Sequence, residues 1–214
     1  MARDHKTDWQ EIRECLSKHH ISCFYHYTAL ANLPHVIRHQ GLLSRAQMRT
    51  TGLKPTRYHS WGAKRRELEN YVCLAVNLPL GMLREEREPQ IVLIVEPQVA
   101  WRSDTLFCPM NTARRELNPD ELFSRFDLAA LEALFEDPTS PRTRDYGAEI
   151  LVRGHIHLRE IRSVLFASGS DRRQARLLCW RPFLAGVLSG QIKWPKFRVD
   201  RHGLIFKRQE RRDI

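Results

Sequence analysis

The sequence lacks paired cysteines, long apolar runs and a surplus of acidic residues, and each absence excludes a class of protein. Its five cysteines are widely spaced and include no Cys-x-x-Cys pair, so neither a disulfide framework nor a zinc knuckle is indicated. No segment approaches the roughly 18 uninterrupted apolar residues of a membrane span, and the first residues contain no apolar signal core. We therefore expect a cytoplasmic protein in a reducing compartment.

The sequence has instead a surplus of basic residues. Lys and Arg together number 35 against 25 for Asp and Glu, which gives a formal net charge of +10 and a pI near 9.8. Such a charge attracts polyanions, and nucleic acid is the commonest polyanionic partner. The 214 residues, 42% of them hydrophobic, are enough to bury a core, and we expect a single domain over residues 1–214.

Hydrophobic patterns predict strands and helices in mixed order. Because the two types do not alternate regularly, the sequence favours an α+β fold with a mostly antiparallel sheet. Strands are expected at residues 21–27, 71–76, 91–95, 105–108, 146–152 and 161–166, and a closing pair of strands at 192–207. Helices are expected at residues 9–16 with Asp8 as N-cap, from Pro34 to Gly41, from Asn118, and at 128–135 and 171–178.

One acidic residue interrupts the apolar strand predicted at residues 146–152. Strand side chains alternate between faces, so Glu149 shares its face with Gly147 and Leu151. Because Gly147 has no side chain, we expect room for a ligand beside the carboxylate. The alternative is an ordinary glutamate that is solvated on an edge strand.

A second group of polar residues is expected to bind a nucleotide. His26 lies between Tyr25 and Tyr27 at a strand end, where a neutral imidazole can hold a ribose hydroxyl or a diphosphate; the alternative is a packed structural histidine. Tyr27, Thr28, Asn32 and Tyr71 are further candidate cofactor contacts. Arg65 and Arg66 directly precede a strand, and a guanidinium can donate two parallel hydrogen bonds to a diphosphate.

The polar segment at residues 45–70 predicts a long functional loop with some helix, and we expect it to contact nucleic acid. Aromatic rings there can stack on unpaired bases and cations can bind phosphates. The candidates for these contacts, with one basic pair further along the chain, are Arg49, Lys54, Arg57, His59, Trp61, Arg114 and Arg115.

Several of these motifs together resemble the DarT family of DNA ADP-ribosyltransferase toxins. The resembling strings are Phe-Tyr-His-Tyr-Thr-Ala-Leu-Ala-Asn-Leu-Pro at 24–34, Gly-Leu-Leu-Ser at 41–44, Lys-Arg-Arg at 64–66, the strand at 91–95 with the following residues to 101, and Ala-Glu-Ile-Leu-Val at 148–152. The similarity lies in their order and spacing and covers residues 24–166.

The resemblance implies an ADP-ribosyltransferase fold with split β-sheets and transfer of ADP-ribose from NAD+, without a metal, to a base of single-stranded DNA. His26 matches the family's NAD-contacting histidine and Glu149 its catalytic glutamate. The NAD-anchoring arginine is Arg65 or Arg66, with Arg66 preferred. The resemblance also implies a toxin that is paired with an antitoxin of ADP-ribosyl hydrolase or macrodomain-like activity.

A carboxylate such as Glu149 suits this chemistry. Cleavage of the nicotinamide–ribose bond develops positive charge at the anomeric carbon, which a fixed negative charge stabilises. Residues 71–77 and 107–113 depart from the family's pattern in regions where the target base can be selected. The target base therefore stays open, and transfer to RNA is an alternative.

Other functions fit the sequence less well. An RNA phosphotransferase of similar fold does not need the strand glutamate, and a restriction-type nuclease would need Lys where Leu151 stands. His35 and His39, or His155 and His157, share a face, but spacing marks no third metal ligand. A non-enzymatic nucleic-acid-binding protein with a structural Glu149 is the remaining alternative.

Overall fold

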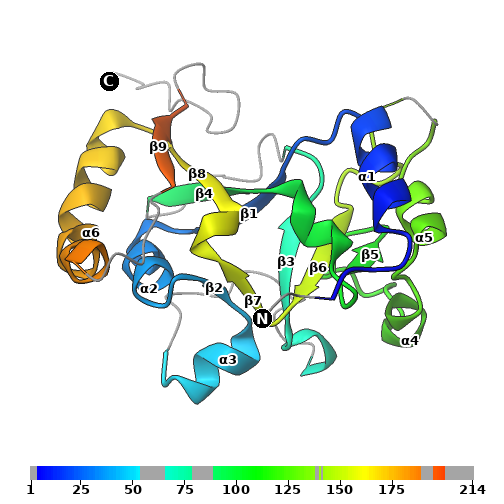
Figure 1. Cartoon of the computed structure of the whole chain (residues 1–214), viewed down its shortest axis with the longest axis horizontal. Coiled ribbons are helices and arrows are strands. Elements are labelled where there is room, and N and C mark those ends of the chain that lie inside the picture. Colours follow the sequence, from blue (N-terminus) through cyan, green and yellow to red (C-terminus); the bar gives the residue numbers. More distant parts are fainter. Residues whose placement is uncertain are drawn as a thin grey trace, which may run out of the picture.

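A computed structural model describes residues 4–53, 66–78, 89–137, 140, 142–188 and 195–200 of the chain. Of Arg66, Pro119 and residues 181–188 it describes the backbone. Figure 1 shows a central β-sheet with helices α2 and α6 towards one end and helices α1, α4 and α5 at the other. No helix in these described ranges combines the length and the apolar character needed to cross a membrane.

Among the described residues, seven strands form the main sheet, in the order β5-β6-β3-β1-β4-β8-β9. Neighbouring strands are antiparallel except β8 and β9, which are parallel. The strands are β1 (Phe24–Ala29), β3 (Tyr71–Ala75), β4 (Gln90–Val95), β5 (Leu106–Cys108), β6 (Glu149–Arg153), β8 (Ile161–Phe166) and β9 (Lys196–Val199). Strands β2 (Gly41–Leu43) and β7 (His155–His157) form a separate antiparallel pair.

The main sheet is split between β1 and β3. Strand β1 pairs with β4 along all six of its residues, whereas its described pairing with β3 is the single position Tyr25↔Ala75. Strands β5, β6 and β3 therefore form one half and β1, β4, β8 and β9 the other. The predicted α+β fold with a split, mostly antiparallel sheet is confirmed.

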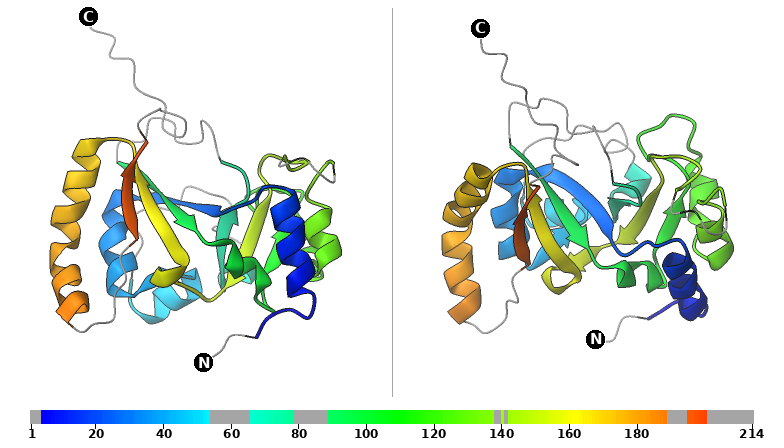
Figure 2. Two further views of the ribbon diagram at one scale, coloured as in Figure 1. Left: turned by 45° about the horizontal axis from the view of Figure 1, so that its top comes forward. Right: turned by 90° about the horizontal axis from the view of Figure 1, so that it is seen from above.

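The helices cover the sheet in two groups, seen from two further directions in Figure 2. They are α1 (Trp9–Lys18), α2 (Leu33–Arg38), α3 (Arg45–Thr50), α4 (Pro119–Phe123), α5 (Leu128–Glu132) and α6 (Gly169–Leu188). Short 3-10 helices are η1 (Leu30–Asn32), η3 (Arg66–Leu68), η4 (Pro97–Trp101) and η5 (Leu158–Glu160). Helices α1, α2, α5 and α6 bury apolar residues in the main core, whereas α3 has no buried residue.

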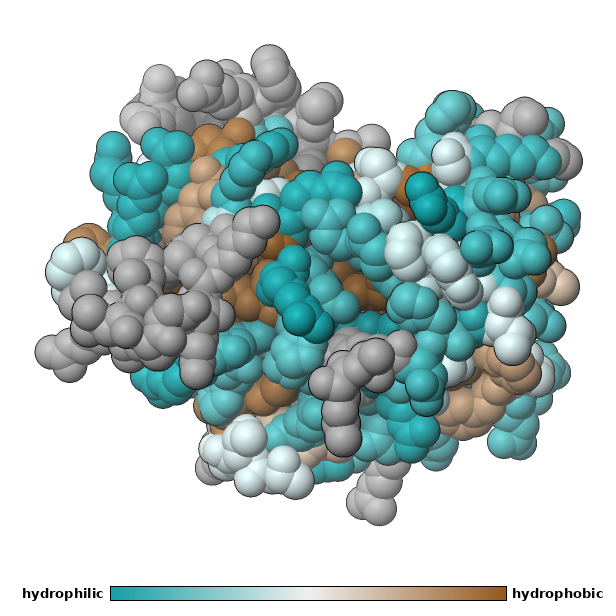
Figure 3. Space-filling model, in the orientation of Figure 1, coloured by the Kyte–Doolittle hydropathy of each residue, from teal (hydrophilic) through white to brown (hydrophobic). Residues whose placement is uncertain are grey.

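The main core lies under the central strands. Phe24, Phe107 and Phe166 are fully buried in it, and each contributes about 2–3 kcal/mol by leaving water. Strand β4 is nearly continuously apolar because both of its faces are covered: Ile91 and Leu93 face this core, and Val92 faces a smaller cluster on the other side. The surface seen in Figure 3 is mostly hydrophilic.

Two expectations for the N-terminal region, a helix cap and a strand start, differ from the structure. Asp8 precedes α1, but its carboxylate makes no capping bond there and accepts the backbone N–H of Leu128 at the start of α5 (2.8 Å). The first strand was expected at residue 21 and begins at Phe24. His20 is left-handed (φ 56°) and the N–H of Ile21 bonds to the carbonyl of Leu16, so these residues complete the end of α1 instead.

Gly41 was expected to end the helix after Pro34, but α2 ends at Arg38 and Gln40 takes the left-handed conformation (φ 55°). Gly41 instead opens β2 with φ 149°, where a Cβ atom would lie 2.0 Å from the carbonyl oxygen of Ile156. The glycine therefore allows β2 and β7 to approach each other closely.

The C-terminal region also differs from expectation. Helix α6 runs from Gly169 to Leu188, well beyond the predicted 171–178. Of the predicted closing pair, residues 196–199 form β9, which pairs with β8 in parallel, and residues 192–194 and 201–207 lie outside the described residues.

Candidate active site

Glu149 is the first residue of β6, between β3 and β5. Its register partners are Ala75 on β3 and Cys108 on β5. Ile150 is buried in the main core, whereas Leu151 is buried in a second cluster on the opposite face of the sheet. The predicted alternation is therefore correct, and the Glu149 side chain lies on the face away from the main core.

The carboxylate is held by the loop that follows β5. Asn111 Nδ2 donates to Glu149 Oε1 (3.0 Å), and the backbone N–H of Thr112 donates to Oε2 (3.0 Å). Asn111 is itself fixed, because its Oδ1 accepts the N–H of Ala113 (2.8 Å). Each carboxylate oxygen thus has a defined donor, which sets the orientation of the group.

The space beside Gly147 is occupied by this loop, so the expectation that it is open to a ligand is wrong. A Cβ atom at Gly147 would lie 3.1 Å from Asn111 Cβ and 3.2 Å from its backbone nitrogen. The missing side chain therefore makes room for Asn111, which in turn reaches Glu149. The loop was not expected to cover this face.

Burial raises the pKa of Glu149 from 4.5 to about 7, and the hydrogen bonds from Thr112 oppose this rise only in part. Near neutral pH the group therefore exists in both protonation states. In its ionised form it can stabilise positive charge, and it can also accept a proton. These are the properties that general base catalysis or electrostatic catalysis requires.

His26 lies on β1 at the split and bonds across it. Its Nδ1 is 3.0 Å from the carbonyl oxygen of Cys73 on β3. Because a carbonyl only accepts, Nδ1 carries the proton, and in the neutral ring Nε2 is an acceptor. Burial lowers the pKa of His26, so the ring is neutral. A neutral acceptor of this kind can bind a hydroxyl group.

Cys73 connects the two halves of the site. Its carbonyl accepts the His26 hydrogen bond, and its Sγ lies 3.8 Å from the hydroxyl of Thr112, whose N–H holds Glu149. Burial raises the pKa of the Cys73 thiol, which therefore stays protonated. A contact path thus runs from His26 through β3 to the catalytic candidate Glu149.

Comparison with known proteins identifies the family to which the chain belongs. The family model described as ssDNA thymidine ADP-ribosyltransferase, DarT, matches residues 25–181. The chain belongs to the DarT family. The match contains both Glu149 and His26, and it confirms the predicted class of enzyme, an NAD-dependent ADP-ribosyltransferase that acts on single-stranded DNA.

Solved DarT structures share the fold at low sequence identity. Thermus sp. 2.9 DarT in complex with NAD+ is 16% identical with a TM-score of 0.53, and the match covers 84% of this chain and 95% of that one. The same protein with ADP-ribosylated ssDNA is 14% identical with a TM-score of 0.55, covering 84% and 94%. Thermosipho africanus DarTG with ADP-ribose is 14% identical with a TM-score of 0.55, and the match covers 83% of this chain but 49% of that chain. Curated proteins show no match by sequence.

The other candidate NAD contacts of this DarT family member lie around β1. Asn32 Nδ2 donates to the hydroxyl of Thr28 (2.9 Å), so these two residues form one polar group at the end of the strand. Tyr27 packs with Val92 and Leu165, and its hydroxyl is buried without a hydrogen-bond partner in the described part of the protein. That hydroxyl is a polar group that a ligand can satisfy.

Tyr71 lies far from Glu149, and the side chains of Arg65 and Arg66 are not described. Tyr71 pairs with Arg153, four residues along β6 from Glu149 and therefore about 13 Å away, and its ring centroid lies 6.2 Å from that of Phe123. Arg66 begins η3, which leads into β3, and its description is limited to the backbone. Arg65 lies outside the described residues.

The candidate nucleic-acid contacts are only partly described. Arg49 is exposed and paired with Glu69, and Arg114 Nη1 lies 2.6 Å from Asp145 Oδ2. Arg115 is exposed. Four further candidates lie outside the described residues: Lys54, Arg57, His59 and Trp61.

The histidine pairs form no metal cluster in the described ranges. The rings of His155 and His157 lie 4.3 Å apart on β7, as their spacing predicted. No group of three or more His, Cys, Asp or Glu side chains among the described residues is arranged to hold a metal ion.

Sequence reasoning missed the residues that position Glu149. Asn111, Thr112 and Cys73 are distant from it along the chain, and only the pairing of β3, β5 and β6 brings them together. The one signal available was the polar pair Asn111-Thr112 directly after an apolar strand.

Proposed function

We propose that Glu149 is the catalytic carboxylate that drives transfer of ADP-ribose from NAD+ to a thymidine base of single-stranded DNA. One observation carries this proposal: a half-buried glutamate, held through both oxygens by Asn111 and Thr112, has its pKa raised to about 7 beside the split of a DarT-family sheet. Thymidine is the target in the family's description.

The reaction exchanges one bond for another at the anomeric carbon of the nicotinamide ribose. The bond from this carbon to nicotinamide breaks, and a new bond forms to a ring nitrogen of thymine. The ionised Glu149 stabilises the positive charge that develops on the ribose during this exchange. The proton displaced from the thymine nitrogen passes to Glu149 or to solvent, which its pKa near neutrality permits.

The residues around β1 fit NAD+ as the co-substrate. His26 offers Nε2 as an acceptor for a ribose hydroxyl, since its Nδ1 is committed to Cys73. The Thr28–Asn32 pair and the buried Tyr27 hydroxyl supply further hydrogen-bonding groups. Arg66, or its neighbour Arg65, supplies the cation for the diphosphate. A DarT from Thermus has been solved with NAD+, which supports the same co-substrate here.

DNA is bound by the basic and aromatic candidates. Arg49, Arg115 and the loop residues Lys54, Arg57, His59 and Trp61 provide cations and rings for phosphates and unpaired bases. Arg114 contributes once DNA competes for its pairing with Asp145. The solved Thermus complex with ADP-ribosylated ssDNA supports this substrate.

The protein acts as a toxin whose partner is an antitoxin that removes or binds ADP-ribose. The supporting observation is the Thermosipho DarTG chain. This protein matches 49% of that chain, so about half of the DarTG chain lies outside the match. Expression of the wild type should arrest growth of the host, and Glu149→Gln should relieve the arrest. Unimpaired growth with the intact wild type would count against the toxin role.

The enzymatic proposal is tested by incubating the purified protein with labelled NAD+ and separate pools of single-stranded DNA, RNA and protein. We expect label on DNA, and mass spectrometry of the released nucleosides should find ADP-ribose on thymidine. Glu149→Gln should abolish transfer while DNA binding persists. Label on RNA or on another base would overturn the stated acceptor, and normal turnover by Glu149→Gln would overturn the assignment of Glu149.

A further inference from the structure

Helix α6 presents an exposed face of arginine and apolar side chains. Residues 172, 176 and 180 are each four positions apart, as are 173 and 177, so their side chains cover one continuous side of the helix. Ala175 and Cys179 lie on the adjoining side, next to Arg172, and are buried against the main core. We call the exposed side the α6 face; it consists of the half-buried Arg172 at its edge and the exposed Arg173, Arg176, Leu177 and Trp180.

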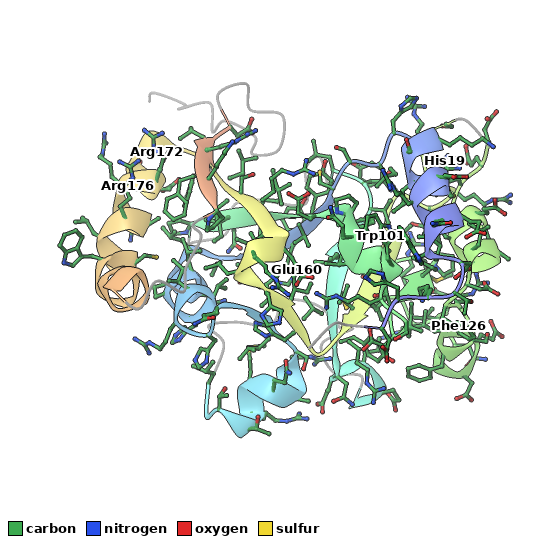
Figure 4. All side chains as sticks on the ribbon, in the orientation of Figure 1. His19, Trp101, Phe126, Glu160, Arg172 and Arg176 are labelled. Carbon is green, nitrogen blue, oxygen red and sulfur yellow. The ribbon has the colours of Figure 1, made fainter. Side chains whose placement is uncertain are left out.

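The apolar members of the α6 face are unusually exposed. Leu177 is 79% exposed and Trp180 is 58% exposed. Single exposed apolar residues are common, but a leucine and a tryptophan that adjoin on one helix face indicate a contact surface. Arg172 and Arg176, labelled in Figure 4, lie at the end of the molecule opposite to His19 and Phe126.

The arginines of this face are not neutralised within the described protein. Arg172, Arg173 and Arg176 form no ion pair with any described residue, and the Nε of Arg172 is buried without a hydrogen-bond partner. Arg49, Arg102, Arg114 and Arg162, by contrast, each pair with a carboxylate. The α6 face therefore presents uncompensated positive charge around an aromatic ring.

The charge and the aromatic ring of the α6 face indicate which kind of partner binds it. A second copy of the chain would place arginine against arginine across a two-fold axis, and residues 201–214 themselves carry a surplus of Arg and Lys. Both would be repelled. Single-stranded nucleic acid complements the α6 face, because its phosphates pair with guanidinium groups and its unstacked bases stack on tryptophan.

We propose that the α6 face is a second binding site for single-stranded DNA, separate from the catalytic site and used to capture the substrate. This inference rests on the proposed function. Strands β6 and β9 are five positions apart in the sheet, which is about 24 Å, and α6 packs beyond this end. A short oligonucleotide can reach Glu149 alone, whereas a longer strand engages both sites.

The test compares binding of oligonucleotides of about six and about thirty nucleotides by fluorescence anisotropy, without NAD+, over a range of salt concentrations. The wild type should bind the long strand more tightly. Trp180→Ala should weaken this binding by roughly tenfold. The double variant Arg173→Gln/Arg176→Gln should reduce the slope of log K against log salt by about 1.4, since each of the two lost phosphate contacts accounts for about 0.7.

The matched control is Arg13→Gln/Arg159→Gln, which removes the same charge from exposed positions on α1 and η5. It should retain the wild-type salt slope and length preference. All variants should keep wild-type rates of transfer to the short oligonucleotide, which checks their folding and tests the catalytic proposal separately.

Three results would overturn the inference. The first is wild-type affinity for the long strand in both α6 variants, which would leave an acidic protein as the partner that fits the face. The second is an equal loss in the Arg13/Arg159 control, which would show a non-specific effect of charge. The third is the same affinity of the wild type for short and long strands. Absence of transfer by the wild type would instead refute the proposed function and leave the binding result valid.

Discussion

Glu149→Gln should make the protein more stable at alkaline pH while it abolishes transfer. The variant keeps the shape of the side chain but removes its titration. Because the folded protein raises the pKa of Glu149 from 4.5 to about 7, the folded state favours the protonated carboxyl. The stabilisation is fully present below pH 4.5 and is lost as the pH rises through about 7.

The size of the effect follows from the same two pKa values. The difference between 4.5 and about 7 corresponds to about 3 kcal/mol of unfolding free energy that the wild type loses between acid and alkaline pH. Glutamine does not ionise and avoids this loss. Its amide group also faces a donor, Asn111 Nδ2 or the N–H of Thr112, which costs about 1–2 kcal/mol at every pH.

The measurement is urea unfolding of both proteins at pH 4.5, 6, 7 and 8.5, conditions that run from the lower pKa to above the higher one. At each pH the unfolding free energy of the wild type is subtracted from that of the variant, so that titrations of other groups cancel. This difference should be negative at the lowest pH and should rise by about 3 kcal/mol by the highest, with its midpoint between the two pKa values.

A difference that stays constant across this range would refute the reasoning, because it would show that Glu149 ionises equally easily in the folded and unfolded chains. A difference that falls with pH would mean that the hydrogen bonds from Asn111 and Thr112 outweigh burial. In both cases the carboxylate would not be poised near neutrality, and its role in proton transfer would be lost.

Three further predictions concern Asn111, His26 and Gly41. Asn111→Ala removes a hydrogen-bond donor to the ionised form of Glu149, so the pKa of Glu149 should rise further. The ascending limb of the pH–kcat/KM profile should therefore move upward by about one pH unit. An unchanged limb would contradict the hydrogen bond between Asn111 and Glu149. His26→Ala should raise KM for NAD+ by roughly tenfold without changing KM for DNA, and a change in the DNA value alone would place His26 in the other subsite. Gly41→Ala should lower the unfolding free energy by more than about 2 kcal/mol, because its Cβ would lie 2.0 Å from the carbonyl of Ile156. Gly52→Ala is the control, since Gly52 also has a positive φ (71°) but has no atom within 4 Å of an added Cβ; in denaturant unfolding it should cost about 1 kcal/mol, and an equal cost at both glycines would refute the steric argument.

The sequence by itself determined the class of fold, and it singled out His26 and Glu149, the two residues on which the candidate site is built. The continuous apolar run of β4 and the alternation around Glu149 depend on which side chains leave water, and neighbours along the chain set that pattern. The order and spacing of the motifs around His26 and Glu149 indicated the enzyme family, which the family match confirms.

Tertiary structure alone decided what surrounds these residues. Gly147 was expected to leave space for a ligand, yet Asn111 fills that space, because the pairing of β5 with β6 brings the loop after β5 over Glu149. In the same way, the Asp8 carboxylate caps α5 instead of α1. Gly41 does not end α2 but allows β7 to pack closely against β2. A side chain's own sequence neighbours specify its local conformation, but its hydrogen-bond partners and the pKa that they and burial produce come from residues that only folding brings near.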